Sequence, residues 1–187
     1  LENHTALKAA VKGSGITVVE EKSYPPDVKD LSPVLRSIKD KAPDAFVGLS
    51  YPPDNILASK QSKEIGFNPK FFYLSVGTAF PFYRATLTPA GVEGVMGMGS
   101  WNPKTSPGAK AYFDAHVASQ KKEPDRWASG ACWASMEILT SAVGKVGLDR
   151  KAIRDYVANN THDTILGKIK FNGSENVGTP GTVSQWQ

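Results

Sequence analysis

Histidine, serine and cysteine are among the residues of this 187-residue chain whose side chains could support catalysis or hold a metal. His4, His116 and His162 stand far apart, and none has a metal-binding partner at helical spacing. Ser129 lies within a helical pattern, whereas a nucleophile of the G-x-S-x-G kind needs a turn between strand and helix. Cys132 lies in an apolar run and is expected to be a small buried residue. We therefore predict no catalytic centre, no metal and no cofactor, and we expect a protein that is not an enzyme.

Composition and charge are those of an ordinary globular protein. Hydrophobic residues make up 40% and charged residues 21% of the chain, which is not typical of disorder. No run of about 18 apolar residues occurs, so no transmembrane helix is predicted. The net charge is only +4, and the basic pair Lys121–Lys122 is expected at a helix end, where cations interact favourably with the helix dipole. We predict no nucleic-acid partner, and a lone cysteine excludes an intrachain disulfide.

Three short apolar runs typical of strands are each followed by residues that could hold a ligand. The loops are 50–54 after the run 45–49, 75–78 after 71–74, and 99–101 after 92–98. Ligands of parallel sheets bind outside the carboxyl ends of the strands. These loops would supply aromatic rings, small hydroxyls and one carboxylate, as small-molecule sites do. We take Tyr51, Ser75 and Trp101 as candidates.

Each candidate also has a structural alternative. Tyr51 could be a half-buried residue at a strand end, Ser75 could be a turn former, and Trp101 could pack at a hinge. Trp133, taken by position alone, fits a helix core better than a binding site.

Strand and helix signals alternate over the first hundred residues. Apolar spacing predicts helices over 6–11, 31–38 and 55–65, and β-branched or apolar runs predict strands over 16–19, 45–49, 71–74 and 92–98. Repeated β–helix–β units predict an α/β fold with a parallel sheet covered by helices.

The pattern then changes. Helical signals alone follow, over 109–119, 128–146 and 150–158, and strand signals return at 164–166, at 169–171 and in the tail 181–187. This order indicates that the chain leaves one lobe and re-enters it, with hinge crossings near Asn102 and near 159–164.

Four groups of short motifs occur in a recognisable order. They are Ala45-Phe46-Val47-Gly48 with Tyr51-Pro52, then Ile65-Gly66-Phe67, then Gly91-Val92-Glu93-Gly94-Val95, and finally Gly167-Lys168-Ile169-Lys170-Phe171 with Gln185-Trp186-Gln187. Over nearly its whole length the chain resembles the C-terminal part of type I periplasmic solute-binding proteins of ABC importers, of the leucine/isoleucine/valine-binding kind.

The resemblance implies a two-lobed receptor that closes by hinge motion on a ligand held between its lobes. Residues 1–101 and 163–187 would form most of a three-layer, parallel-sheet second lobe, and 105–160 would be helices of the first lobe. The N-terminal half of the protein, with the first lobe's sheet, would be absent. The expected partners are that missing half, a small-molecule ligand and the importer's permease, and the expected location is the periplasm.

The resemblance also implies roles for the candidate residues. Tyr51 matches an aromatic residue that lines the family's cleft, and Trp133 matches an aromatic residue at the mouth of a first-lobe helix. With Trp101 they would make an aromatic-walled cleft. Amino-acid-binding members place an acid near Ser75 to pair with the ligand's ammonium group, but Leu74–Thr78 contains none. We therefore expect a small carboxylate ligand, an aromatic or branched apolar acid, with amino acids in doubt.

One alternative function keeps the same fold. The chain could be the ligand-sensing domain of a regulator or receptor. A DNA-binding or membrane-spanning segment upstream would favour that reading, and a cleavable signal peptide would favour the importer.

Overall fold

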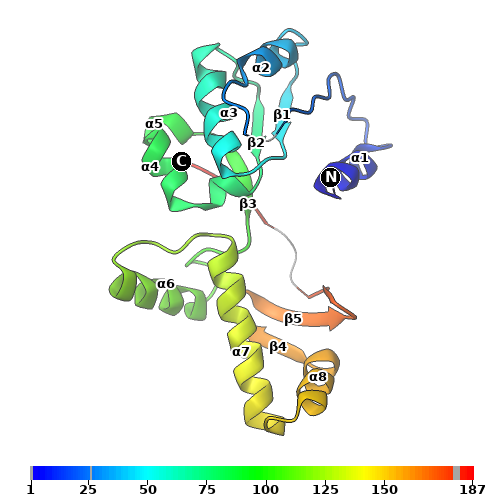
Figure 1. Ribbon diagram of the computed structural model, residues 1–187, viewed down its shortest axis with the longest axis vertical. Coiled ribbons are helices and arrows are strands. Elements are labelled where there is room, and N and C mark those ends of the chain that lie inside the picture. The colour runs from blue at the N-terminus through cyan, green and yellow to red at the C-terminus, as the bar shows by residue number, and fades with distance from the viewer. Residues whose placement is uncertain (1, 26, 179–181) are drawn as a thin grey trace. The chain divides into compact units, whose positions relative to one another are not determined.

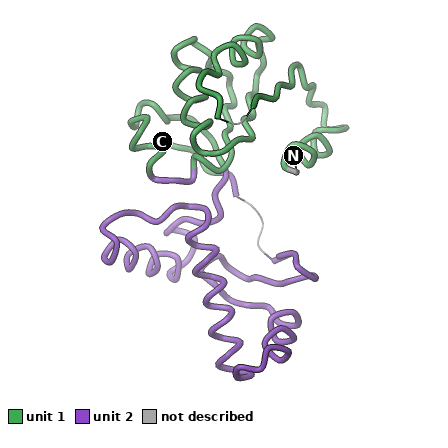
Figure 2. Tube along the Cα trace, in the orientation of Figure 1, with its two compact units in different colours: residues 1–78, 82–97, 184–187 green, residues 79–81, 98–183 purple. Residues whose placement is uncertain are grey.

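The computed structural model describes residues 2–25, 27–178 and 182–187. Two compact units divide the chain (Figure 2). Unit 1 comprises residues 1–78, 82–97 and 184–187, and unit 2 comprises 79–81 and 98–183. Each unit is described by itself.

Unit 1 is built on a four-stranded sheet with the order β1-β2-β3-β7. Its strands are β1 (Ala45–Gly48), β2 (Phe71–Leu74), β3 (Met96–Gly99) and β7 (Thr182–Gln185). The pairs β1–β2 and β2–β3 are parallel, with Ala45 opposite Phe71 and Tyr73 opposite Met96. The α/β class and the parallel sheet predicted from the sequence are therefore confirmed.

Helices cover this sheet and form the core of unit 1 with it (Figure 1). They are α2 (Ser32–Lys39), α3 (Pro52–Glu64), α4 (Pro81–Leu87) and the short α5 (Pro89–Val92), with a 3₁₀ turn at Val76–Ala79. Their buried apolar side chains pack with those of the strands and loops: Leu31, Leu35, Ala58, Ile65, Phe67, Leu74, Tyr83, Val92 and Val95. Trp186 packs against the same core, and its backbone exchanges hydrogen bonds with Gly94 and Val95.

The expected strand over 16–19 is not formed. After α1 (Glu2–Val11) the chain is irregular, and Ile16, Val18 and Val19 are exposed. A β-branched run becomes a strand only when another strand pairs with its backbone, and no pairing includes this segment in the part of the chain that the structure describes. Ion pairs from Glu21 to His4 and Lys8 connect it to α1 instead.

The expected strand over 92–98 is shorter and starts later. Helix α5 begins at Pro89, whose fixed φ suits a first helical turn. Gly94 then turns the chain at φ +80°, a value that glycine adopts without strain, and β3 begins only at Met96.

Unit 2 combines three longer helices with a small antiparallel sheet. The helices are α6 (Pro107–Gln120), α7 (Ala128–Val146) and α8 (Arg150–Asn159), and the sheet has the order β4 (Thr161–Thr164), β5 (Gly167–Asn172), β6 (Glu175–Asn176). Buried residues of the helices and the sheet form one core: Trp101, Ala109, Tyr112, Ala134, Ile138, Ile165 and Ile169. Among the described residues, no helix combines the length and the hydropathy that crossing a bilayer requires.

The second group of strands differs from the expectation in position and partner. The predicted strand at 164–166 lies at 161–164, and Ile165 and Leu166 form the turn to β5. These strands pair with each other and pack on α7 and α8, so the return of strand signals near 164 does not mark a return to the first sheet. That return comes at β7, while Gly181 of the expected tail strand lies outside the described residues. The lobe boundaries expected for the whole protein stay a prediction. In that prediction the chain re-enters the second lobe at residue 163, whereas unit 2 extends to residue 183.

Candidate ligand-binding site

Ser75 lies at the carboxyl end of β2 and is bonded to the loop after β1. Its hydroxyl donates to the carbonyl of Ser50 at 2.5 Å and accepts from the amide of Ser50 at 2.9 Å. Ser75 is only 4% exposed. Its hydroxyl therefore already has a donor and an acceptor partner within unit 1.

Asn55 extends this network from the first turn of α3. Its Nδ2 donates to the Ser50 hydroxyl at 2.8 Å, and its Oδ1 accepts from the Gly77 amide at 2.8 Å. Asn55 is fully buried. Tyr24 also hydrogen-bonds to Ser50, although burial is the larger influence and raises the pKa of Tyr24. The loops after β1 and β2 are thus joined through side chains.

Glycine is required where these loops pack most closely. A Cβ at position 77 would collide with the Asn55 amide and lie 2.8 Å from the Cα of Pro52. A Cβ at Gly97 on β3 would collide with Thr78. The carboxyl end of the sheet is consequently close-packed at Gly77 and Gly97, and the groups in contact at these two positions are uncharged.

Tyr51 projects from this packed edge. It is the residue before α3, and 76% of its surface is exposed. Together with Asp27 and Asp54 it lines a cavity of about 190 Å³. Desolvation raises the pKa of the Asp54 carboxyl, and the nearby charge of Asp27 raises it further. The ring of Tyr51 is free of the packing that holds Ser75, and two carboxylates lie near it.

Trp101, in unit 2, is buried rather than exposed. It is 4% exposed, and its Nε1 donates to the carbonyl of Asp125 at 3.1 Å. The guanidinium of Arg126 lies 5.2 Å from the centre of its ring, and Gly130 packs so closely that a Cβ there would lie 2.5 Å from Cδ1. Tyr112 packs edge-on at 5.2 Å. These contacts match the packing role that the sequence offered as the alternative for Trp101.

Trp133 lies on α7 and remains 47% exposed. Its ring contacts Tyr112 at 5.0 Å. With neighbours from α6 and α7 it lines a groove of about 560 Å³, whose other residues include His116, Cys132 and Met136. Cys132 is exposed, so the expectation that it is buried is wrong. The buried residues of helix α7 are Gly130, Ala134, Ile138 and Ala142, whereas Trp133 and Met136 are exposed.

Within the units, the candidates fall into two pairs. Tyr51 and Ser75 are linked through Ser50 in unit 1, and Trp101 and Trp133 both contact Tyr112 in unit 2. The sequence reasoning missed Asn55 and Tyr112, which make these links. An asparagine four residues after a strand-end tyrosine, in the first turn of a helix, was the available signal for Asn55.

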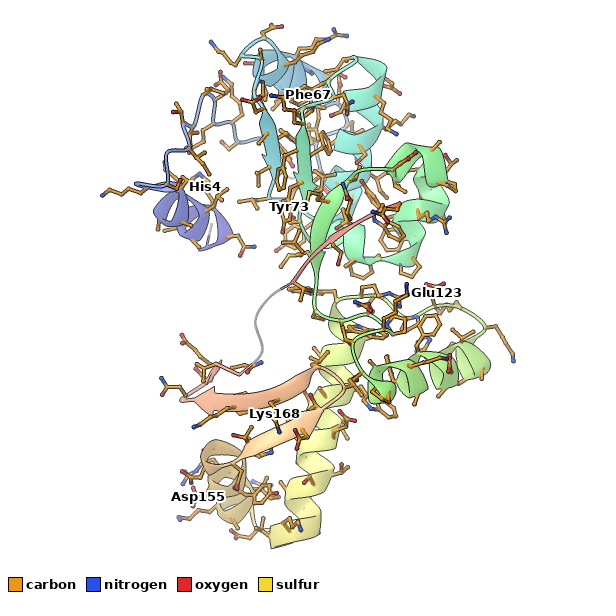
Figure 3. The ribbon with its side chains drawn as sticks, turned by 180° about the vertical axis from the view of Figure 1, so that it is seen from behind. His4, Phe67, Tyr73, Glu123, Asp155 and Lys168 are labelled. Carbon is orange, nitrogen blue, oxygen red and sulfur yellow. The ribbon has the colours of Figure 1, made fainter. Side chains whose placement is uncertain are left out.

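The three histidines have different surroundings within their own units. His4 lies on α1, away from Tyr73 on β2 (Figure 3), and His116 bonds to the carbonyl of Lys122. His162 is buried between Tyr156 and Phe171 and bonds to the carbonyl of Val157. Over the described ranges, no three His, Cys, Asp or Glu side chains gather as metal ligands would.

Solved structures with the same fold include proteins with bound ligands. A leucine-binding protein from Thermotoga maritima superposes with a TM-score of 0.83 at 20% identity, over 97% of this chain and 52% of its own. A solute-binding protein of an ABC transporter from R. palustris, in complex with benzoate, gives a TM-score of 0.83 at 16% identity, over 98% and 51%. The chain therefore spans about half the length of these proteins.

Comparison of sequences also finds similarity to solute-binding proteins. A Leu/Ile/Val-binding protein homolog from Brucella abortus is 33% identical over 58 residues, which are 31% of this chain and 14% of that protein. A family model described as periplasmic binding protein matches residues 2–186. Because that match covers almost the whole sequence, this chain belongs to the periplasmic binding protein family.

Proposed function

We propose that the protein containing this chain is an extracytoplasmic solute receptor of an ABC importer. It would capture a small molecule between two lobes, close by hinge motion and deliver the ligand to a membrane permease. Family membership supports this role and a periplasmic location. The N-terminal half of the same protein would supply the remaining contacts to the ligand.

The proposed ligand is a small carboxylate with an aromatic or branched apolar body. The observation that carries this proposal is the exposed ring of Tyr51 at the carboxyl end of a parallel sheet, where Ser50 and Ser75 are already hydrogen-bonded to each other. The exposed ring of Trp133 supports it from unit 2. Relatives of the same fold bind leucine and benzoate, which belong to this chemical range.

The free energies are consistent with two rings contributing part of the affinity. A micromolar dissociation constant corresponds to about 8 kcal/mol. Burying a ring-sized apolar group yields about 1.5–3 kcal/mol, and an aromatic pair adds about 0.5–1.5 kcal/mol. Two such rings would therefore supply about 4 kcal/mol or more, which is at least half, and hydrogen bonds to the ligand carboxylate would supply any remainder.

Calorimetric titration of the complete encoded protein with benzoate, leucine and isoleucine tests the proposal. We expect micromolar binding of benzoate. Binding of leucine far more tightly than benzoate would refute the expectation that the ligand is not an amino acid, and binding of none of the three would refute the carboxylate class.

Asp54 provides the control for ligand charge. Its carboxylate lies beside Tyr51, where it would attract an ammonium group and repel a carboxylate. We expect Asp54→Asn to leave benzoate affinity unchanged or higher. A selective loss of leucine binding in this variant would assign the site to amino acids instead.

A further inference from the structure

Asn55 holds both loops at the carboxyl end of the unit 1 sheet. Its side chain is fully buried at the start of α3, where an amide without partners would be costly. Both ends of the amide are used, Nδ2 on the Ser50 hydroxyl and Oδ1 on the Gly77 backbone amide. One side chain thereby connects the loop after β1 to the loop after β2.

Ser75 makes the same connection independently. The backbone amide and carbonyl of Ser50 are both hydrogen-bonded to the Ser75 hydroxyl. The Ser50 hydroxyl accepts from the Asn55 side chain, so all three polar groups of Ser50 are held. The carbonyl of Ser75 in turn accepts from the Thr78 hydroxyl at 2.9 Å. Residues 50, 55, 75 and 77 therefore form one hydrogen-bonded unit, which we call the loop clamp.

Tyr51 depends on the loop clamp for its direction. Its ring is 76% exposed and gains little orientation from packing. Its backbone is fixed on both sides. Ser50, which precedes it, belongs to the clamp, and the Tyr51 carbonyl accepts a hydrogen bond from the backbone N–H of Asn55 at 3.0 Å. Pro52, which follows, begins α3. The backbone position from which the Tyr51 side chain projects is thus set by its neighbours.

We infer that Asn55 is a positioning residue for ligand capture, which fixes the loop that carries Tyr51 and so presents its ring ready for the ligand. The inference rests on the proposed function, in which Tyr51 contacts the ligand. A loop that is already ordered needs no ordering when the ligand arrives, and that lowers the cost of binding. Asn55 itself is buried and acts through Tyr51 and Ser50.

A double-mutant cycle separates this role from simple stabilisation. Benzoate affinity of the complete encoded protein is measured for wild type, Asn55→Ala, Tyr51→Ala and the double variant. We expect Asn55→Ala to weaken binding about tenfold when Tyr51 is present and less than about twofold when it is absent, a coupling within the range for neighbouring residues. Equal losses in both backgrounds would overturn the inference.

A second buried hydrogen bond in unit 1 supplies the matched control. Ser59, also on α3, bonds to the Tyr83 hydroxyl at 2.5 Å, and both residues are buried. Tyr83→Phe removes that bond without touching the loop clamp. We expect it to lower stability and leave benzoate affinity unchanged. A tenfold loss of affinity in this control would show that any destabilisation of unit 1 weakens binding, and would overturn the inference.

Asn55→Asp covers the case in which Asn55→Ala fails to fold. Aspartate keeps an acceptor for the Gly77 amide, and the Ser50 hydroxyl can turn to donate to the second oxygen. In the Asp54→Asn background, which keeps the number of carboxylates near Tyr51 unchanged, we expect near wild-type affinity and slow hydrogen exchange of the Gly77 amide. Wild-type affinity together with fast exchange at Gly77 would overturn the inference, since binding would then not need the clamp. If the wild-type protein binds none of benzoate, leucine and isoleucine, the proposed function itself fails. If the wild type binds and the affinity losses of Asn55→Ala and Tyr51→Ala simply add in the double variant, only the role of Asn55 is refuted.

Discussion

Truncation of Tyr51 separates a ligand contact from a structural residue. Because 76% of its surface is exposed in the free chain, Tyr51→Ala removes little packing, and we expect the free energy of unfolding to change by less than about 0.5 kcal/mol. A bound ligand would bury the ring, worth about 1.5–3 kcal/mol. With partial burial we expect a loss near 2 kcal/mol, which is about a 30-fold higher dissociation constant.

Calorimetric titration with benzoate, leucine and isoleucine measures the affinity, and urea denaturation measures the stability. Tyr51→Phe keeps the ring and should bind nearly as tightly as wild type. Phe71 is the control, because it is a partly exposed ring at the amino end of β2, opposite the proposed site. Its truncation should leave affinity unchanged. A change of less than twofold on Tyr51→Ala for every ligand that binds would refute the reasoning.

Three further substitutions test the packing around the candidate site. Gly77→Ala places a Cβ against the first turn of α3 and should lower the free energy of unfolding by about 1–3 kcal/mol in urea denaturation. Gly130→Ala should cost a similar amount by displacing Trp101, visible as a shift in tryptophan fluorescence. Tyr83→Phe leaves Ser59 without its partner and should cost about 1–3 kcal/mol at neutral pH. Burial raises the pKa of Tyr83 to about 12. The unfolded chain therefore loses the Tyr83 proton at a lower pH than the folded chain, and the wild type loses stability as the pH rises from 10 to 12. The difference in unfolding free energy between wild type and Tyr83→Phe should shrink over that range.

A matched control is available for Gly130→Ala, and a contrary result can be named for each substitution. Gly144 lies on the same helix as Gly130 with open space around it, so Gly144→Ala should stabilise by about 0.5–1 kcal/mol. Equal effects at the two positions would contradict the packing argument. An unchanged unfolding free energy in Gly77→Ala would show that the loop clamp yields easily. A pH-independent difference for Tyr83→Phe would contradict the raised pKa.

The sequence predicted the regular elements best where a pattern alone determines them. The helix over 128–146 and the strand over 71–74 have the predicted bounds. The strand over 16–19 failed because pairing is a property of two segments, and a β-branched run reports only its own preference. The hairpin after 160 was predicted as strands, but strand propensity does not say which sheet a strand joins.

The environment of single side chains was harder to predict. Cys132 was expected inside because its neighbours are apolar, yet α7 is apolar on more than one side, and its buried face holds Gly130, Ala134, Ile138 and Ala142. Trp133 is outside on the same helix. A helix with few charges offers no polar face from which the buried face could be read.

Burial divides the four candidates into two kinds. A ligand that used the Ser75 hydroxyl or the Trp101 indole would have to displace the Ser50 and Asp125 groups that now hold them, and each buried group left unpaired costs about 1–3 kcal/mol. A micromolar complex is worth only about 8 kcal/mol. The free energy lost by leaving buried groups unpaired at two positions would be too large a part of it. We infer that in unit 1 the ligand contacts the exposed ring of Tyr51, while Ser75 holds the backbone beside it. Specificity would then depend on the shape of the ligand's apolar body more than on side-chain hydroxyls of this half.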